Sequence, residues 1–326
     1  MPSSLVAKET MRTGGTALKA AEALRHIGVV GLGRMGHAFA TNLVTAGYRV
    51  AVFDRNPDKA NACLGAEAMP DLAGLAGCDA ILSSLPDDAA LAAVTLSNPG
   101  LVGVMKPGAV HISMSTVSPE ISRRLAETHE AQGQAYVAAP ILGNPDLARA
   151  QKLFVLTAGR QDVLDRVKPI LETLGQRIFI MGDDPSSANL MKLAANVLTA
   201  TTLEGMGEVL ALLRKGGVDQ RLAFDVLTNS LFDSKVHRTY GGKIVDERFR
   251  PAGMVVPLAV KDVRLALAEA ERSSVPMPFA SLVRDRLVSV VARGWGDMDW
   301  SALGLLAAQD AGLKSAEDLH DLTDRL

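Results

Sequence analysis

The stretch that decides the fold is His26-Ile-Gly-Val-Val-Gly-Leu-Gly-Arg-Met-Gly36, in which an apolar run leads into three regularly spaced glycines. Residues 27–30 are typical of a buried strand, and the helical run Ala38-Phe-Ala-Thr-Asn-Leu-Val44 follows the glycines. A G-x-G-x-x-G turn between a strand and a helix is typical of a dinucleotide site, where the pyrophosphate meets the unpaired N–H groups of the helix. The sequence therefore predicts a nicotinamide dinucleotide as cofactor.

Each glycine of this turn has a separate expected role. Gly31 allows the tight turn, Gly33 lets a phosphate approach the backbone, and Gly36 lets the helix pack closely on the strand. A second strand over residues 49–53 ends at Asp54, where an acidic residue of such a domain meets the adenosine ribose. The predicted cofactor-binding segment consists of Gly31, Leu32, Gly33, Arg34, Met35 and Gly36.

The choice between NAD and NADP depends on residues just after this second strand. Asp54 favours the free ribose hydroxyls of NAD. Arg55, Asn56 and Lys59 offer charges and donors that suit the 2′-phosphate of NADP, although Arg55 is equally well explained as a solvated side chain. The sequence favours NADP slightly and leaves NAD open.

Strand and helix patterns alternate as far as about residue 184, which predicts an α/β, doubly wound Rossmann domain over residues 26–185. Its further strands are expected at 79–85, 109–113, 135–139, 153–157 and 177–180. Alanine- and leucine-rich sequence then predicts a long interdomain helix over residues 186–215. Helical patterns at 220–228, 257–272 and 277–292 predict an all-α C-terminal domain over residues 216–326. Residues 1–25 are expected to be an N-terminal extension, either a short helix, a disordered tail or a misassigned start.

Composition excludes several classes of partner. The chain has 326 residues, a net charge of -2 and a pI near 6.3, so no basic surface favours nucleic acid or membrane. No apolar run reaches the roughly 18 residues that span a bilayer, and the first 25 residues lack the apolar core of a signal peptide. Cys63, Cys78 and the six histidines show no metal-ligand spacing. We expect a metal-free cytoplasmic protein with a small-molecule partner.

Four short segments follow the glycine turn in order: Ser84-Leu-Pro86, Ser115-Thr-Val-Ser-Pro119, Lys192-Leu-Ala-Ala-Asn196 and Leu258-Ala-Val-Lys-Asp262. Together with Gly31-Leu-Gly-Arg-Met-Gly36 they resemble the motifs of the β-hydroxyacid dehydrogenase family. That family includes 3-hydroxyisobutyrate dehydrogenases, tartronate semialdehyde reductases and glyoxylate/succinic semialdehyde reductases. The resemblance covers residues 26 to about 310. It implies an NAD(P)-dependent oxidoreductase that interconverts a β-hydroxyacid, or a related alcohol, and its carbonyl compound.

The expected catalytic residues are Lys192 and Asn196. Hydride transfer to a carbonyl creates an alkoxide, so a proton donor must lie within hydrogen-bond reach of that oxygen. Lys192 lies among apolar residues, where partial desolvation lowers the pKa of an ammonium. Asn196 follows four residues later, on the same helical face, and can hold the lysine or bind substrate oxygens. The family usually has a second asparagine at position 195, where this chain has Ala195.

The resemblance also implies where substrate and cofactor bind. The implied substrate-binding residues are Ser115, Thr116, Gly143, Asn144 and Lys261. The implied cofactor contacts beyond the glycine turn are Leu85, Pro86, Thr116, Lys261 and Asp262. Lys261 and Asp262 resemble the pair that closes over the nicotinamide from the second domain, and their alternative is a solvated charge pair at the start of a helix.

One segment departs from the family pattern. The family typically has Asp-Ala-Pro-Val-Ser-Gly-Gly, whereas this chain has Ala138-Ala-Pro-Ile-Leu-Gly-Asn144. Leu142 replaces a serine whose hydroxyl would bind a small carboxylate, and an apolar pocket does not satisfy a carboxylate. We therefore expect a substrate that is bulkier or less anionic than a three-carbon semialdehyde.

Two other functions remain open from the sequence. Imine reductases have a similar fold and cofactor motif but generally lack the catalytic lysine, so Lys192 argues against that alternative. A non-catalytic NADP-binding scaffold would tolerate the loss of the proton donor. The long apolar helix over residues 186–215 also predicts an assembly. Such a helix usually finds part of its partner surface in another subunit, so we expect a homodimer or homotetramer formed through the C-terminal helices.

Overall fold

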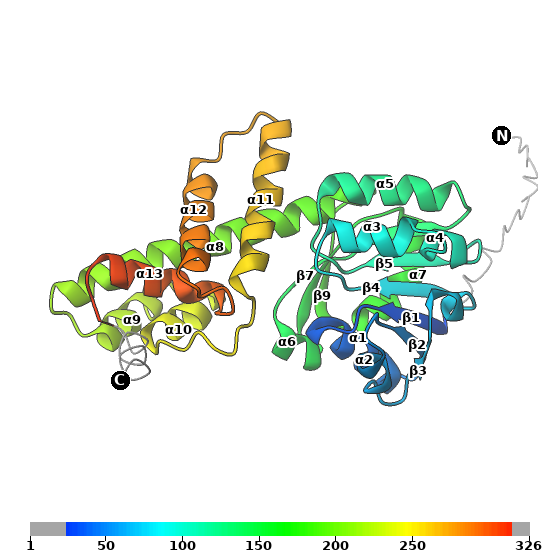
Figure 1. The fold of residues 1–326 in the computed structure, drawn as a ribbon, viewed down its shortest axis with the longest axis horizontal. Coiled ribbons are helices and arrows are strands. Elements are labelled where there is room, and N and C mark those ends of the chain that lie inside the picture. The colour runs from blue at the N-terminus through cyan, green and yellow to red at the C-terminus, as the bar shows by residue number, and fades with distance from the viewer. Residues whose placement is uncertain (1–23, 315–326) are drawn as a thin grey trace, which may run out of the picture.

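The computed structural model describes residues 24–314, which form two halves joined by one long helix (Figure 1). The first half contains both β-sheets, and the second half is built of helices. The predicted N-terminal extension therefore lies outside the described residues, except for Leu24 and Arg25. The predicted division of the chain at residues 185 and 215 stays a prediction, although the helix that joins the halves has almost these limits.

The first half is organised around a six-stranded parallel sheet with the order β3-β2-β1-β4-β5-β6. The chain order reverses between β1 and β4, and ligands of such sheets bind at the carboxyl ends of the strands at this point. The strands are mostly apolar because helices cover both faces of the sheet. The strands are β1 (His26–Val30), β2 (Arg49–Phe53), β3 (Glu67–Ala68), β4 (Ala80–Ser83), β5 (Val110–Ser113) and β6 (Ala135–Ala138).

The helices of this half begin at caps that the sequence encodes. The side chain of Ser118 accepts a hydrogen bond from the backbone of Ile121, and Pro119 occupies the first helical position. Asp87 caps α3 in the same way, by accepting a hydrogen bond from the backbone of Ala90. The helices are α1 (Arg34–Thr45), α2 (Pro57–Asn61), η1 (Leu72–Leu75), α3 (Asp88–Leu96), α4 (Leu101–Val104), α5 (Pro119–Glu130) and α7 (Gln161–Glu172).

The last strands of this half form a second sheet, which the sequence did not distinguish from the first. β7 (Ile141–Leu142), β8 (Leu153–Thr157) and β9 (Gly175–Ile180) pair in that order, and β7 runs antiparallel to β8. The physical reason is the short return of the chain after β7. Only α6 (Pro145–Arg149) separates β7 from β8, which is too little chain for a parallel crossover. A single antiparallel bridge between Ala138 and Ala158 links the two sheets.

The long helix α8 (Ser186–Lys215) has 30 residues and begins and ends within one residue of the prediction. At 1.5 Å per residue it is about 45 Å long. The predicted helices α9 (Gln220–Thr228), α11 (Val256–Arg272) and α12 (Pro278–Ala292) are confirmed, and α11 and α12 stand side by side across α8 (Figure 1). The sequence did not predict η2 (His237–Gly241), α10 (Gly242–Val245), η3 (Trp300–Ala302) and α13 (Leu303–Asp310).

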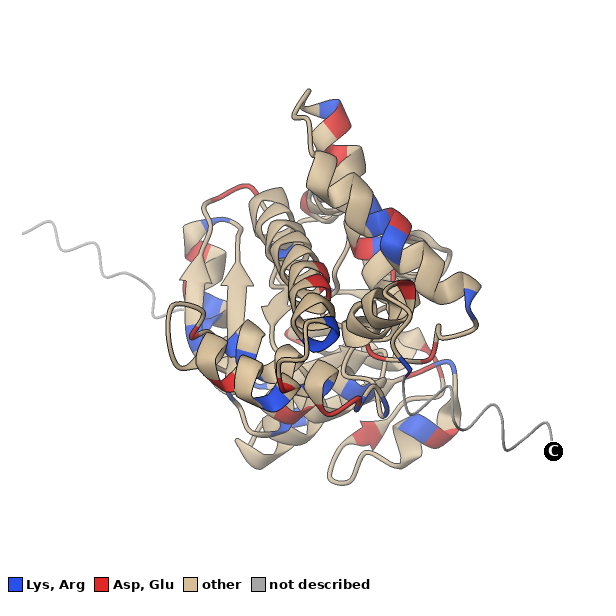
Figure 2. Ribbon diagram, turned by 90° about the vertical axis from the view of Figure 1, so that its left-hand side faces the viewer, with Lys and Arg blue, Asp and Glu red and all other residues tan. Residues whose placement is uncertain are grey.

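Basic and acidic residues are interspersed over both halves of the molecule (Figure 2). This distribution agrees with the small net charge of the chain. Within residues 24–314, no helix is both long enough and apolar enough to pass through a bilayer.

In the glycine turn, two similar substitutions are expected to differ in their effect on stability. In Gly36→Ala the new Cβ would lie 1.8 Å from the carbonyl oxygen of Gly31, so the backbone must shift. We expect a loss of about 1–3 kcal/mol in the free energy of unfolding, as for other overpacked sites. Gly33→Ala is the matched control, because no atom lies within 4 Å of its Cβ. Thermal unfolding measures both; equal melting temperatures would contradict the assigned role of Gly36.

Candidate active site

A cavity of about 420 Å³ lies between the two halves of the chain. Its lining comes from the carboxyl ends of β1, β4 and β5, from the loop after β7, and from α8 and α11. The lining residues are Gly33, Arg34, Met35, Phe39, Ser84, Leu85, Pro86, Met114, Ser115, Thr116, Ile141, Gly143, Asn144, Pro145, Lys192, Asn196, Ala252, Gly253, Met254, Val255, Leu258, Lys261 and Asp262. Most of the predicted site residues thus meet in one place.

The glycine turn at one end of the cavity has the geometry that a pyrophosphate needs. Gly31 has a φ of 86°, which favours glycine, and Gly33 faces open space. Gly33 is also the N-cap of α1, where no side chain caps the helix and no acidic residue lies in the first turn. The first N–H groups of α1 are therefore available to an anion. These residues fit a dinucleotide cofactor.

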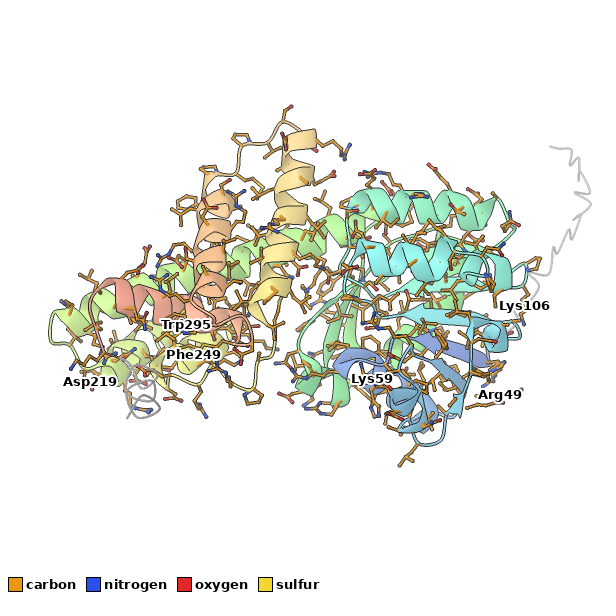
Figure 3. All side chains as sticks on the ribbon, viewed as in Figure 1. Arg49, Lys59, Lys106, Asp219, Phe249 and Trp295 are labelled. Carbon is orange, nitrogen blue, oxygen red and sulfur yellow. The ribbon has the colours of Figure 1, made fainter. Side chains whose placement is uncertain are left out.

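The residues predicted at the adenosine end lie outside the cavity. One carboxylate oxygen of Asp54 accepts a hydrogen bond from Leu32 N–H at 2.7 Å, and the other accepts one from Asn56 N–H at 2.9 Å. Asp54 therefore braces the glycine turn, and Asn56 in turn caps α2. Arg55 and Lys59 are exposed, and Lys59 is visible on the N-terminal half in Figure 3. Their contact with a cofactor stays a prediction.

Lys192 and Asn196 lie together inside the cavity, on one face of α8. The Nζ atom of Lys192 donates a hydrogen bond to Oδ1 of Asn196 at 3.0 Å. The Nδ2 atom of Asn196 donates to Oδ2 of Asp262, on α11, at 2.5 Å. All three side chains are buried. The four-residue spacing of Lys192 and Asn196 on the helix places both groups at the same point of the cavity.

The surroundings of Lys192 change its acidity. Burial lowers the pKa of its ammonium to about 8, because the charged form loses hydration. The carboxylate of Asp262 opposes this shift, and the ammonium of Lys261 adds to it. Both protonation states of Lys192 are thus accessible near neutral pH, as general acid–base catalysis requires.

Lys261 joins the two halves across the cavity. Its Nζ atom pairs with Oδ1 of Asp262 at 2.9 Å and donates to the carbonyl oxygens of Thr116, at 2.5 Å, and Pro86, at 3.0 Å. Lys261 and Asp262 are therefore part of an interdomain network, which argues against a solvated charge pair. The network connects Lys192 to the loops that follow β4 and β5.

The four predicted substrate-binding residues of the N-terminal half all line the cavity. The hydroxyl of Ser115 accepts a hydrogen bond from Leu85 N–H at 2.9 Å and so holds the loop that contains Leu85 and Pro86. The carbonyl of Thr116 accepts a hydrogen bond from Lys261, so the side chain of Thr116 is the group that could bind a substrate. Gly143 has a φ of 148°, and the side chain of Asn144 caps α6. Their contact with a substrate stays a prediction.

The position of Leu142 corrects the argument made from the sequence. Leu142 does not line the cavity; it packs against a hydrophobic cluster that includes Leu91 and Val117. Its neighbour Ile141 lines the cavity instead. Successive side chains of a strand point to opposite faces, so Leu142 cannot fill the space next to Ile141. The substitution of serine by Leu142 therefore does not by itself make the cavity apolar.

One wall of the cavity was not predicted from the sequence. It is formed by residues 252–255, directly before α11. We call this segment the substrate wall. Pro251 and Gly253 are typical of a loop and do not indicate a binding site. The only signal in the sequence was that this loop lies a few residues before Lys261 and Asp262. Phe39 and Met114 also line the cavity and were missed. Among residues 24–314, no group of three or more histidine, cysteine or acidic side chains could hold a metal ion.

Known families match both halves of the chain. Residues 26–182 match the NAD binding domain of 6-phosphogluconate dehydrogenase, and residues 186–306 match the family described as NAD-binding of NADP-dependent 3-hydroxyisobutyrate dehydrogenase. The chain is 37% identical over 281 residues to the uncharacterized oxidoreductase YfjR of Bacillus subtilis, across 85% of this chain and 98% of that protein. It is 29% identical to glyoxylate/succinic semialdehyde reductase 1 of Arabidopsis thaliana, across 85% and 96% of the two chains.

Solved structures give the same relationship. The structure of 3-hydroxyisobutyrate dehydrogenase from Salmonella typhimurium matches with a TM-score of 0.78 and 25% identity, across 86% of this chain and 99% of that one. An imine reductase from Pseudomonas sp. is more distant, with a TM-score of 0.57 and 21% identity across 87% and 99%. These matches agree with the cavity, which combines a dinucleotide turn with Lys192 and Asn196. The chain belongs to the β-hydroxyacid dehydrogenase family of NAD(P)-dependent oxidoreductases that act on CH–OH groups.

Proposed function

We propose that this enzyme interconverts a β-hydroxyacid, or a related alcohol, and its carbonyl compound, with Lys192 as the proton donor and acceptor. When bound, the nicotinamide supplies or accepts the hydride. The observation that carries the proposal is a buried lysine with a pKa of about 8 in the cavity that the glycine turn also lines. A non-catalytic scaffold would have no need to bury this charge at that point.

Asn196 and Asp262 determine the orientation of the Lys192 ammonium toward the substrate. A carboxylate only accepts hydrogen bonds, so the amide nitrogen of Asn196 must face Asp262. This orientation turns the amide oxygen of Asn196 toward Lys192. Lys192 keeps two further donor positions for the oxygen of the substrate. In the reductive direction its ammonium gives a proton to that oxygen, and in the oxidative direction its neutral amine takes the proton away.

The lining of the cavity supports a substrate that is bulkier or less anionic than a three-carbon semialdehyde. Two of the three basic side chains in the lining are engaged by backbone carbonyls, Arg34 by Ala252 and Lys261 by Pro86 and Thr116. Ser115, Thr116, Gly143 and Asn144 would shape the polar part of the site. The apolar part is formed by Met35, Phe39, Leu85, Met114, Ile141, Met254, Val255 and Leu258.

Exposed side chains support a preference for NADP and an oligomeric assembly. Arg55 and Lys59 support NADP as the preferred coenzyme, since both side chains are free to reach a 2′-phosphate. Leu198, Val209 and Leu212 lie along one face of α8 and are 68%, 44% and 71% exposed. A second copy of the chain would cover this apolar face, which supports a homodimer or homotetramer formed through the C-terminal helices. We place the enzyme in the cytoplasm.

The substrate proposal is tested with NADPH and NADH oxidation against a panel of aldehydes, keto acids and cyclic imines. We expect a higher kcat/KM with NADPH than with NADH, because Arg55 and Lys59 attract the extra phosphate. We expect carbonyl compounds with an apolar substituent to be reduced faster than glyoxylate or tartronate semialdehyde. A panel in which these two small substrates outperform all larger ones, or in which only imines react, would contradict the proposal.

The role of Lys192 is tested by Lys192→Ala. General acid–base catalysis contributes about 10²–10⁴-fold, so we expect kcat to fall by at least about a hundredfold. Coenzyme affinity, measured by the change in NADPH fluorescence on binding, should stay within about twofold, because the glycine turn is unchanged. A fall in kcat of less than about tenfold would rule out Lys192 as the proton donor.

The pKa of Lys192 predicts opposite pH profiles for the two directions. Reduction needs the ammonium, so its kcat should fall as pH rises through about 8. Oxidation needs the neutral amine, so its kcat should rise through the same range. Lys192→Arg is the matched control, because a guanidinium stays protonated and should lack both transitions. Identical pH profiles in the two directions would mean that another group transfers the proton.

A further inference from the structure

All four residues of the substrate wall, Ala252, Gly253, Met254 and Val255, line the cavity. They come from the C-terminal half and lie opposite the dinucleotide turn, whose Arg34 donates a hydrogen bond to the carbonyl of Ala252 at 2.5 Å. The wall has no regular secondary structure of its own, so contacts from outside the segment must fix its backbone. Its shape determines how much room a substrate has beside Lys192.

The carboxylate of Asp299 supplies these contacts from behind the wall. One oxygen, Oδ2, accepts hydrogen bonds from Gly253 N–H at 2.8 Å and from Met254 N–H at 3.4 Å, and it pairs with Lys243 Nζ at 2.6 Å. The other oxygen, Oδ1, accepts from the backbone and the hydroxyl of Ser301 at 3.1 and 2.7 Å. Asp299 has an exposed fraction of 0%. In each of these hydrogen bonds the carboxylate is the acceptor and its partner the donor.

Backbone hydrogen bonds extend the same attachment. Trp300 N–H donates to the carbonyl of Met254 at 3.0 Å, and Val256 N–H donates to the carbonyl of Met298 at 3.1 Å. Asp299 N–H donates to the carbonyl of Phe249, whose place in the helical half is marked in Figure 3. The wall is thus paired with residues 298–300, which lie outside the cavity lining.

We propose that Asp299 is a positioning residue that fixes the substrate wall and thereby determines the fit of the substrate. The proposal rests on the proposed function, because it takes the cavity as the substrate site. Neither Asp299 nor Lys243 is among the cavity-lining residues, so Asp299 acts through the backbone of Gly253 and Met254, and Lys243 acts through Asp299. Both oxygens of this carboxylate accept hydrogen bonds. In an asparagine one of them would be replaced by an NH2 group, which would face a donor in either orientation of the amide. The charge of Asp299 is therefore part of the architecture of the site.

The test is Asp299→Asn, with Glu204→Gln as the matched control. Glu204 is also a buried carboxylate of the C-terminal half, but it pairs with Arg286 and contacts neither the cavity nor the wall. We expect Asp299→Asn to raise KM for the best carbonyl substrate at least about tenfold, since a buried donor left unpaired has an effect of this size. Its kcat should stay within about threefold, and Glu204→Gln should leave KM unchanged. A fall in kcat at unchanged KM, or an equal rise of KM in the control, would overturn the proposal.

A second measurement reports on the wall without any substrate. In Asp299→Asn, amide hydrogen exchange should accelerate about tenfold or more in peptides that cover the wall, and stay unchanged in peptides of α8 around Lys192. Should Asp299→Asn fail to fold, Lys243→Met weakens the same attachment from its more exposed side, with a smaller change in the same direction. Unchanged exchange at the wall contradicts the role of Asp299. Failure of the proposed function would instead appear in Lys192→Ala as an unchanged kcat, whatever the exchange data show.

Discussion

The ammonium of Lys192 is buried in the cavity between the halves, and a hydrogen-bonded network links it to both of them. Asn196 accepts its hydrogen bond, Asp262 orients Asn196, and Lys261 links Asp262 to the carbonyls of Thr116 and Pro86. Removing one member of such a network leaves the others unpaired in a medium of low dielectric constant. The network that joins the two halves therefore also encloses Lys192, whose burial lowers the pKa of its ammonium.

Much of this arrangement could be predicted from the sequence because the decisive features are local. The role of Gly36 depends on the backbone of its own turn, and Asn196 lies beside Lys192 because one helical turn separates them. The length of α8 follows from an uninterrupted helical composition. In each case the physical cause lies within a few residues of the feature itself, so a pattern in the sequence reveals it.

The features that were wrong or missed depend on distant contacts. The pairing of β8 with β7 depends on where the chain turns back after β6, which periodicity does not show. Ile141, not Leu142, lines the cavity, and a strand of only two residues gives no pattern from which its inner face could be read. The substrate wall is held by Asp299, about 45 residues later, and no local signal connects the two. Topology and side-chain direction were therefore the limits of sequence analysis.

The two ends of the cavity differ in the contacts that fix their backbone. At the end formed by the glycine turn, the cavity faces the first backbone N–H groups of α1, and close backbone contacts fix Gly31 and Gly36. At the other end the lining is a loop whose backbone donates hydrogen bonds to one buried carboxylate, that of Asp299. A loop of this kind can change its side chains without disturbing the hydrogen bonds that hold it. Substitutions at Met254 and its neighbours would thus change the lining of the cavity, while the geometry around Lys192 and the glycine turn stays the same.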